Sequence, residues 1–313
     1  MSWQPPPEGP DATTPPAGAT PPGPPPPPLP HLHPSGQGDI GPLPTLPGGQ
    51  APHLREMRLG ELLDAAIKLY RSNWKTFMGI VAFVVVPLQL LQNYLARDVF
   101  TTTAFETTNE VGSGELVTLL IFPAVQLLFV TPFLTAAIAR ATSEIYLGGQ
   151  PGVGDVYSFA LRRTHSILWV TFLSGLVTIF GFVALIIPGV IFFVRFSFSN
   201  STVVVEGARG TKAMGRSWRL AKGFFWKIFG TVILAGILAS IINSVIQIPL
   251  AIAADSIGTN GWLLRALGNS AGEVITSPFT GMVIVLLYFD MRIRKEGFDL
   301  ALLAREMAPP APA

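Results

Sequence analysis

Apolar residues form five long blocks along the chain, separated by more polar segments, of which 140–165 and 206–225 are basic. Four blocks have at least the roughly 20 residues that a helix needs to cross the hydrocarbon core of a bilayer, and they cover 76–96, 115–139, 226–253 and 271–289. The remaining block, 166–205, would extend about 60 Å as a single helix, which is twice the thickness of that core. We therefore expect two helices in this block and six spans in all.

The break in the long block is predicted at Pro188 and Gly189. Proline disfavours helix in the preceding residue, and glycine supplies the freedom that a turn needs. We expect a tight hairpin, with one helix ending near Ile187 and the next covering 189–205. The alternative is a re-entrant loop over 189–205. That alternative would move the basic segment 206–227 across the membrane, which the positive-inside rule disfavours.

Lysine and arginine are unevenly distributed among the connecting segments. With six spans and a cytoplasmic N-terminus, almost all of them face the cytoplasm. Apart from Arg195, which lies within a block, only Arg97 and Arg265 face the other side. This distribution predicts that both termini are cytoplasmic.

Amphipathic segments precede the first, third and fifth spans, at 58–79, 153–173 and 211–230. Each interleaves cationic and apolar residues at helical spacing and ends in aromatic residues. Such helices lie in the membrane interface with the cationic face toward anionic headgroups. We expect an all-α membrane protein built from three hairpins, each preceded by a cytoplasmic interfacial helix.

Proline-rich tails flank this predicted six-helix domain, which covers 55–303. The N-terminal tail, 1–54, holds most of the 29 prolines and few charged residues, and the C-terminal tail, 304–313, is short. Such segments bury too little apolar surface to offset the entropy of ordering, so we expect both to be disordered. The N-terminal tail could instead dock a protein partner through its proline motifs.

The composition restricts the class of protein. Of the 313 residues, 49% are hydrophobic and 13% are charged, against roughly 25% charged in soluble domains, and the mean hydropathy is +0.48. A net charge of +2 argues against a nucleic-acid partner. The absence of cysteine excludes disulfides, thiolate metal sites and cysteine nucleophiles.

The sequence contains no HExxH, GxSxG or P-loop pattern, so we expect no catalytic site, cofactor or metal. Four acidic residues are predicted to lie at the ends of spans: Glu115, Glu206, Glu273 and Asp290. We interpret Asp290 as a helix-end ion pair of small energetic consequence with the basic residues 292–295. Without a carboxylate or histidine at mid-depth, a proton-coupled transporter is disfavoured.

Arg195 lies inside the long apolar block, about 10 Å below the predicted outer boundary. Two interpretations stay open. Arg195 could reach the outer headgroups or pair with a polar residue of a neighbouring span, the candidates being Gln92, Asn93, Asn243, Gln247, Glu115 and Glu273. It could instead anchor an anionic group in a cavity between hairpins. The candidate ligand or lipid contacts are Arg195, Arg216, Trp218, Arg219 and Lys222.

Four stretches, "LGELLDAAIKLYRSNW", "IIPGVIFFVRFSFSNSTVVVEG", "AMGRSWRLAKGFFWKIFG" and "LYFDMRIRKEGFDL", resemble the membrane-domain family named after glycerophosphoryl diester phosphodiesterases. The resemblance covers about 58–302. It implies a bacterial plasma-membrane protein, and we expect the chain to lack the phosphodiesterase catalytic domain that follows this module in some members.

Two functions follow as hypotheses. The first is a non-enzymatic membrane protein that binds or passes an anionic lipid-derived or amphipathic ligand, with Arg195 as the anchor. The second is a membrane scaffold that holds protein partners through its basic cytoplasmic helices and proline-rich tail. In both, anionic lipid headgroups at the cytoplasmic interface are the expected membrane partners.

Overall fold

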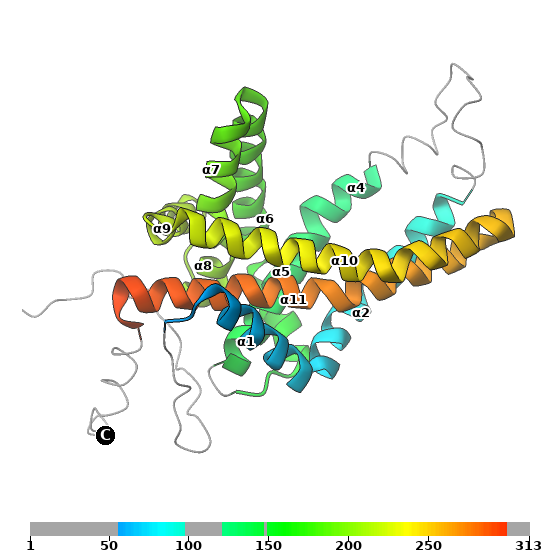
Figure 1. Ribbon diagram of the computed structural model, residues 1–313, viewed down its shortest axis with the longest axis horizontal. Helices are drawn as coiled ribbons and strands as arrows, with labels where there is room; N and C mark the ends of the chain where they lie inside the picture. The colour runs from blue at the N-terminus through cyan, green and yellow to red at the C-terminus, as the bar shows by residue number, and fades with distance from the viewer. Residues whose placement is uncertain (1–55, 98–120, 147–148, 299–313) are drawn as a thin grey trace, which may run out of the picture. The chain divides into compact units, whose positions relative to one another are not determined.

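The computed structural model describes residues 56–97, 121–146 and 149–298, and all secondary structure in these ranges is helical (Figure 1). Six helical stretches are long and apolar enough to cross a membrane: α2 (Trp74–Leu95), α4 to α5 (Phe122–Tyr146), α6 (Val153–Ala184), α7 to α8 (Ile186–Glu206), α10 (Phe225–Ile257) and α11 (Trp262–Glu296). The predicted all-α class with six candidate spans is confirmed. The predicted tails, 1–54 and 304–313, lie outside the described residues.

Helix α11 is the centre of the packing. In its apolar part 67% of the residues are buried, against 22% in α10 and 17% in α6. It packs along α10 and α2 and also contacts α1 (Leu59–Ser72) and α5 (Thr131–Tyr146), and α10 and α11 run side by side in Figure 1. Met282, Leu286 and Phe289 of α11 are fully buried. The apolar residues that remain exposed lie mainly on the surrounding helices, as expected for faces that contact lipid.

Two glycines of α11, Gly268 and Gly272, allow α10 to approach closely. A Cβ atom on Gly268 would lie 3.1 Å from Cβ of Leu250, and one on Gly272 would collide with the amide oxygen of Asn243. Glycines four residues apart lie on one face of a helix, where they let the backbones of two membrane helices approach. This pair therefore fixes the register between α10 and α11.

The break between α6 and α7 (Ile186–Phe196) occurs at Leu185, upstream of the predicted position. Leu185 is extended, with φ −163° and ψ 148°, and Pro188 lies in the first turn of α7. A first-turn residue needs no N–H donor for the helix, so Pro188 is accommodated there. Gly189 serves close packing instead of the turn, because a Cβ atom there would collide with Phe182 of α6.

Two of the three predicted interfacial helices are separate elements, α1 and α9 (Thr211–Ala221). Asn73 ends α1, and Gly223, at φ 91°, follows α9. The prediction of a separate interfacial helix at 153–173 is wrong, because α6 runs unbroken through 153–184. Residues 153–173 contain no proline to stop the helix, and their apolar periodicity continues directly into the span.

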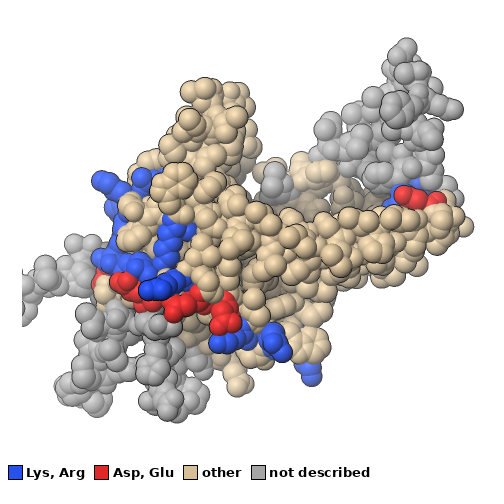
Figure 2. All heavy atoms as spheres, in the orientation of Figure 1, with Lys and Arg blue, Asp and Glu red and all other residues tan. Residues whose placement is uncertain are grey.

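In Figure 2, charged side chains gather over α9 and the last turns of α11 and continue over α1, while most of the remaining visible surface is free of them. A smaller pair, Asp255 with Arg265, lies near the junction of α10 and α11, where η3 (Gly258–Gly261) connects them. Two polar ends separated by an apolar body are the arrangement expected of helices that cross a bilayer.

Candidate functional site: a cationic cluster at the end of α9

The fourth candidate span is divided at Ser197 and Phe198, between α7 and α8 (Ser199–Glu206). Ser217 of α9 is fully buried beside this break. Its hydroxyl donates to the carbonyl of Arg195 at 2.7 Å and accepts the N–H of Phe198 at 3.2 Å. In an apolar environment such freed backbone groups must be satisfied within the protein. Ser217 does this, and it thereby fixes α9 against the break.

Arg195 extends from the last turn of α7 onto α9. Its Nη1 donates to the carbonyl oxygen of Trp218 at 3.2 Å, and its Cζ lies 4.9 Å from the centroid of the Trp218 ring. The rings of Phe192 and Phe196 pack against the same indole, with centroids 6.1 Å and 5.7 Å away. The Nε atom of Arg195 is buried and has no hydrogen-bond partner in the described structure. The guanidinium is therefore held in place but retains an unused donor.

The predicted partners of Arg195 on neighbouring spans are wrong where the structure describes them, and Glu115 lies outside the described residues. Arg195 is one residue from the end of α7, so it reaches α9 and not the interior of the other spans. Three of these candidates, Asn93, Asn243 and Glu273, bond to other polar groups instead, and Oε1 of Gln92 is buried without a hydrogen-bond partner in the described structure. Asn243 accepts from Gln247, and Glu273 accepts from Gln89.

Two more basic side chains lie beside Arg195 at the C-terminal end of α9. Lys295 of α11 donates to the carbonyl of Arg219 at 2.6 Å, and its ammonium group is repelled by the charges of Arg195 and Lys222 and attracted by that of Glu296. The last carbonyls of a helix lack helical partners and attract cations, so Arg195 and Lys295 cap α9. We define Arg195, Trp218, Lys222 and Lys295 as the α9 cationic cluster.

The side chain of Arg219 is exposed next to this cluster, but Arg216 belongs to a separate ion-pair network. Arg216 binds Glu206 at 2.8 Å and Glu296 at 2.7 Å, and the hydroxyl of Tyr288 donates to Glu206 at 2.6 Å. Burial alone would lower the pKa of Arg216, but the hydrogen bonds to Glu296 and Glu206 outweigh it and raise the pKa. Arg216 thus links α8, α9 and α11 through charge-assisted bonds.

The predicted ion pair of Asp290 with the basic residues that follow it is present, with Arg294, but Asp290 is buried and makes further contacts that were not predicted. Its side chain is 0% exposed. It accepts the N–H of Met57 at 2.7 Å and Nε of Arg294 at 3.0 Å, and it forms a close ion pair with Lys227. Lys227 also donates to the carbonyl of Met57 at 2.7 Å. Asp290 therefore joins the segment before α1 to α10 and α11, a contact that only the folded chain brings together.

Glu273 also departs from its prediction. Helix α11 begins at Trp262, nine residues before the predicted block. Glu273 therefore lies eleven residues inside the helix and not at a span end. The early start has a sequence signal that we missed, since residues 262–270 contain no proline and have good helical propensity apart from glycine and asparagine.

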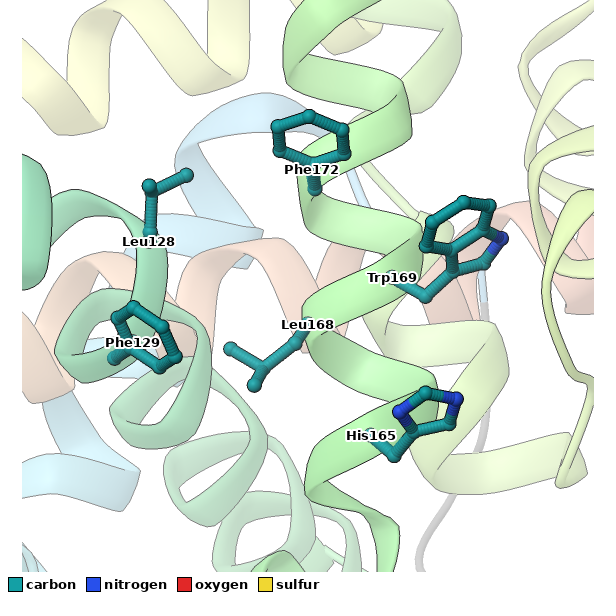
Figure 3. A pocket seen from close by; sticks show the side chains of 6 residues that line it. All are labelled: Leu128, Phe129, His165, Leu168, Trp169 and Phe172. Carbon is teal, nitrogen blue, oxygen red and sulfur yellow. The ribbon is translucent and has the colours of Figure 1, made fainter.

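A pocket of about 210 Å³ lies between η2 (Gln126–Val130) and α6. Figure 3 shows Leu128 and Phe129 on one side and Leu168 and Phe172 on the other, with His165 the single titratable lining residue. No group of three or more His, Cys, Asp or Glu side chains able to hold a metal occurs within the described ranges. The pocket thus offers apolar surface, and its lining provides no second titratable group to pair with His165 in acid–base chemistry.

The six apolar helices define the class, a multi-pass membrane protein. Residues 72–290 match the family described as a domain of unknown function, DUF7847, and the chain belongs to that family. No curated protein and no solved structure shows significant similarity to it. The comparisons provide no link to the glycerophosphoryl diester phosphodiesterase membrane domain, so that resemblance stays a prediction.

Proposed function

We propose that this chain is a non-enzymatic protein of a bacterial plasma membrane that binds an anionic lipid headgroup, or a lipid-derived amphipathic anion, at the α9 cationic cluster. One contrast at the charged end supports this. The neighbouring cations Arg216 and Lys227 are paired with carboxylates. Arg195, Lys222 and Lys295 form no salt bridge with any described Asp or Glu. An anion at the cluster would relieve their mutual repulsion.

The chemistry of the cluster suits a phosphate group. A guanidinium is a planar fork of donors that matches phosphate oxygens, and an ammonium adds a compact point charge. Capping α9 occupies Nη1 of Arg195 but leaves its buried Nε without an acceptor. The rings of Trp218, Phe192 and Phe196 give the site an apolar wall on which the glycerol and first methylenes of a lipid can lie.

The proposal includes an orientation. We propose three hairpins with both termini in the cytoplasm, so that the α9 cationic cluster faces the cytoplasmic leaflet. Because Arg195 contacts α9, this places it on the cytoplasmic side, in place of the position near the outer boundary that we expected from the sequence. The gathering of Lys and Arg at one end of the molecule supports this orientation through the positive-inside rule (Figure 2). The anionic lipids of that leaflet then supply the ligand.

Native mass spectrometry tests the proposal. The parent protein and the variants Arg195→Gln and Lys222→Gln are reconstituted with equal parts of phosphatidylglycerol and phosphatidylcholine. The lipids that stay bound after gentle removal of detergent are identified from the mass of the complex. Arg97→Gln is the matched control, because Arg97 also stacks on a ring, with Cζ 4.3 Å from the centroid of Tyr94, outside the cluster.

We expect phosphatidylglycerol to stay bound to the parent and to Arg97→Gln, and to be lost from both cluster variants. Circular dichroism before the measurement establishes that each variant is folded. If all four proteins keep the same lipids, the proposal is wrong, and Arg195 acts only as the cap of α9. The interaction-module hypothesis would then be the one to pursue.

A further inference from the structure

A row of amide side chains leads to a carboxylate between α2 and α11. Gln89 donates to Glu273 at 3.0 Å, and Asn269 donates to Asn93 at 3.5 Å. Asn93 in turn donates to the backbone carbonyl of Gln89 at 2.8 Å. The side chains of Gln89 and Asn93 are only 8% and 7% exposed. We call these four residues, Gln89, Asn93, Asn269 and Glu273, the α2–α11 polar ladder.

The ladder lies far from the charged end of the molecule. Helices α2 and α11 are antiparallel at the ladder. From the Gln89–Glu273 contact to the Asn93–Asn269 contact, α2 advances by four residues and α11 goes back by four. Glu273 lies eleven residues after Trp262 and seventeen before Asp290, or about 16 Å and about 26 Å along the axis, between the two polar ends of α11. Near the start of α11, Trp262 packs on Tyr94 with ring centroids 5.3 Å apart, as in an interfacial aromatic pair.

Among the residues that the structure describes, no charged group pairs with Glu273. The charged side chains of the flanking helices lie near the helix ends: Lys75 on α2, Lys227 and Asp255 on α10, and Arg265 two turns away on α11. The other titratable group of α2 is Tyr94, beside Trp262. An ionised carboxylate without a counter-charge within a span is costly, and such residues are functional candidates.

The ladder also supplies ligand atoms for a counter-charge. Carboxylate and amide oxygens are hard ligands that suit small oxygen-seeking cations. Pro278 has no N–H, so the carbonyl of Val274, next to Glu273, loses its usual helical partner. A helical carbonyl freed by proline, beside side-chain oxygens, offers the same kind of ligand atom as the unwound backbone that coordinates cations in transporters.

We propose that Glu273 and the amides of the α2–α11 polar ladder bind a small monovalent cation, either a proton or a sodium ion, between the two polar ends of α11. The site joins α2 to α11, which is the most buried candidate span. Binding or release of the cation therefore changes the contact between these two helices. This inference is independent of the lipid site, because it shares no residue with the α9 cationic cluster.

Carbodiimide labelling tests the proposal. Dicyclohexylcarbodiimide is apolar and adds to protonated carboxyl groups, and the modified peptide is identified by mass spectrometry. The full-length protein in phosphatidylcholine nanodiscs is labelled at a series of pH values, in sodium chloride or in choline chloride at equal ionic strength. Asp64 is the internal reference, since its side chain is 61% exposed. Glu273→Gln keeps hydrogen-bonding capacity and is the variant control.

We expect Glu273 to be labelled faster than Asp64, and the Glu273→Gln peptide to stay unmodified. If the cation is a proton, the rate falls by about tenfold per pH unit above the point where the carboxyl ionises, equally in both salts. If it is sodium, sodium chloride slows the labelling and choline chloride does not. Labelling of Glu273 that is no faster than that of Asp64 and is indifferent to pH and sodium overturns the proposal, and the ladder then serves helix packing alone.

Discussion

Replacing Asp290 with asparagine should strongly destabilise the fold. The substitution keeps the shape of the side chain but removes the charge that Lys227 and Arg294 share. Removing one partner of a buried ion pair costs about 3–5 kcal/mol. Both basic side chains are 20% exposed and therefore partly solvated. We expect the lower end, about 3 kcal/mol, which is on the order of a 100-fold change in the unfolding equilibrium constant.

The chain offers a matched control. Asp64 pairs with Lys68 at 2.8 Å with the same i, i+4 spacing that relates Asp290 to Arg294, but its side chain is 61% exposed. Asp64→Asn should cost at most about 0.5 kcal/mol. The measurement is unfolding in mixed micelles of increasing sodium dodecyl sulfate content, followed by circular dichroism.

Two results would refute this reasoning. Equal unfolding midpoints for Asp290→Asn and Asp64→Asn would mean that burial adds nothing to the Asp290 pair. A double variant with Lys227→Met tests the mechanism separately. If the pair is coupled, the effects of Asp290→Asn and Lys227→Met on the free energy of unfolding will not add, and strict additivity would assign the loss to another cause.

Two further predictions concern packing and one concerns orientation in the membrane. Gly189→Ala should destabilise the α6–α7 pair by about 1–3 kcal/mol through overpacking, whereas Gly175→Ala, where nothing lies within 4 Å, should not; the same unfolding assay compares them. Ser217→Ala should cost about 1–3 kcal/mol because it leaves buried backbone groups without a partner, and the exposed Ser256→Ala should be neutral. In this cysteine-free chain, a membrane-impermeant thiol reagent should label Ser256→Cys but not Arg209→Cys in intact cells; the reverse pattern would invert the proposed orientation.

The length and apolar content of the blocks were sufficient to predict the class and the number of candidate spans. Each block is long and apolar enough that helix is the one backbone arrangement able to satisfy its hydrogen bonds in lipid. The exact helix ends were less predictable. The break before α7 moved to Leu185 because Pro188 fits the first turn of a helix, and α6 absorbed a predicted interfacial helix because its sequence has no stop.

The candidate site was partly predictable from residue type. Arg195, Trp218 and Lys222 were singled out by sequence and do lie together, but Lys295 joined them only through folding, from 73 positions beyond Lys222. Residue type also gave no sign that Arg216 would be paired with Glu206 and Glu296.

The sequence by itself determined which segments are helical and apolar, because those properties depend on neighbours within a few turns. Tertiary structure alone decided how the few polar groups are paired. Asp290 with Met57 and Gln89 with Glu273 are separated by 233 and 184 residues. Such contacts depend on which faces of α2, α10 and α11 meet, and small residues such as Gly272 set that choice through steric fit over distances that no local pattern records.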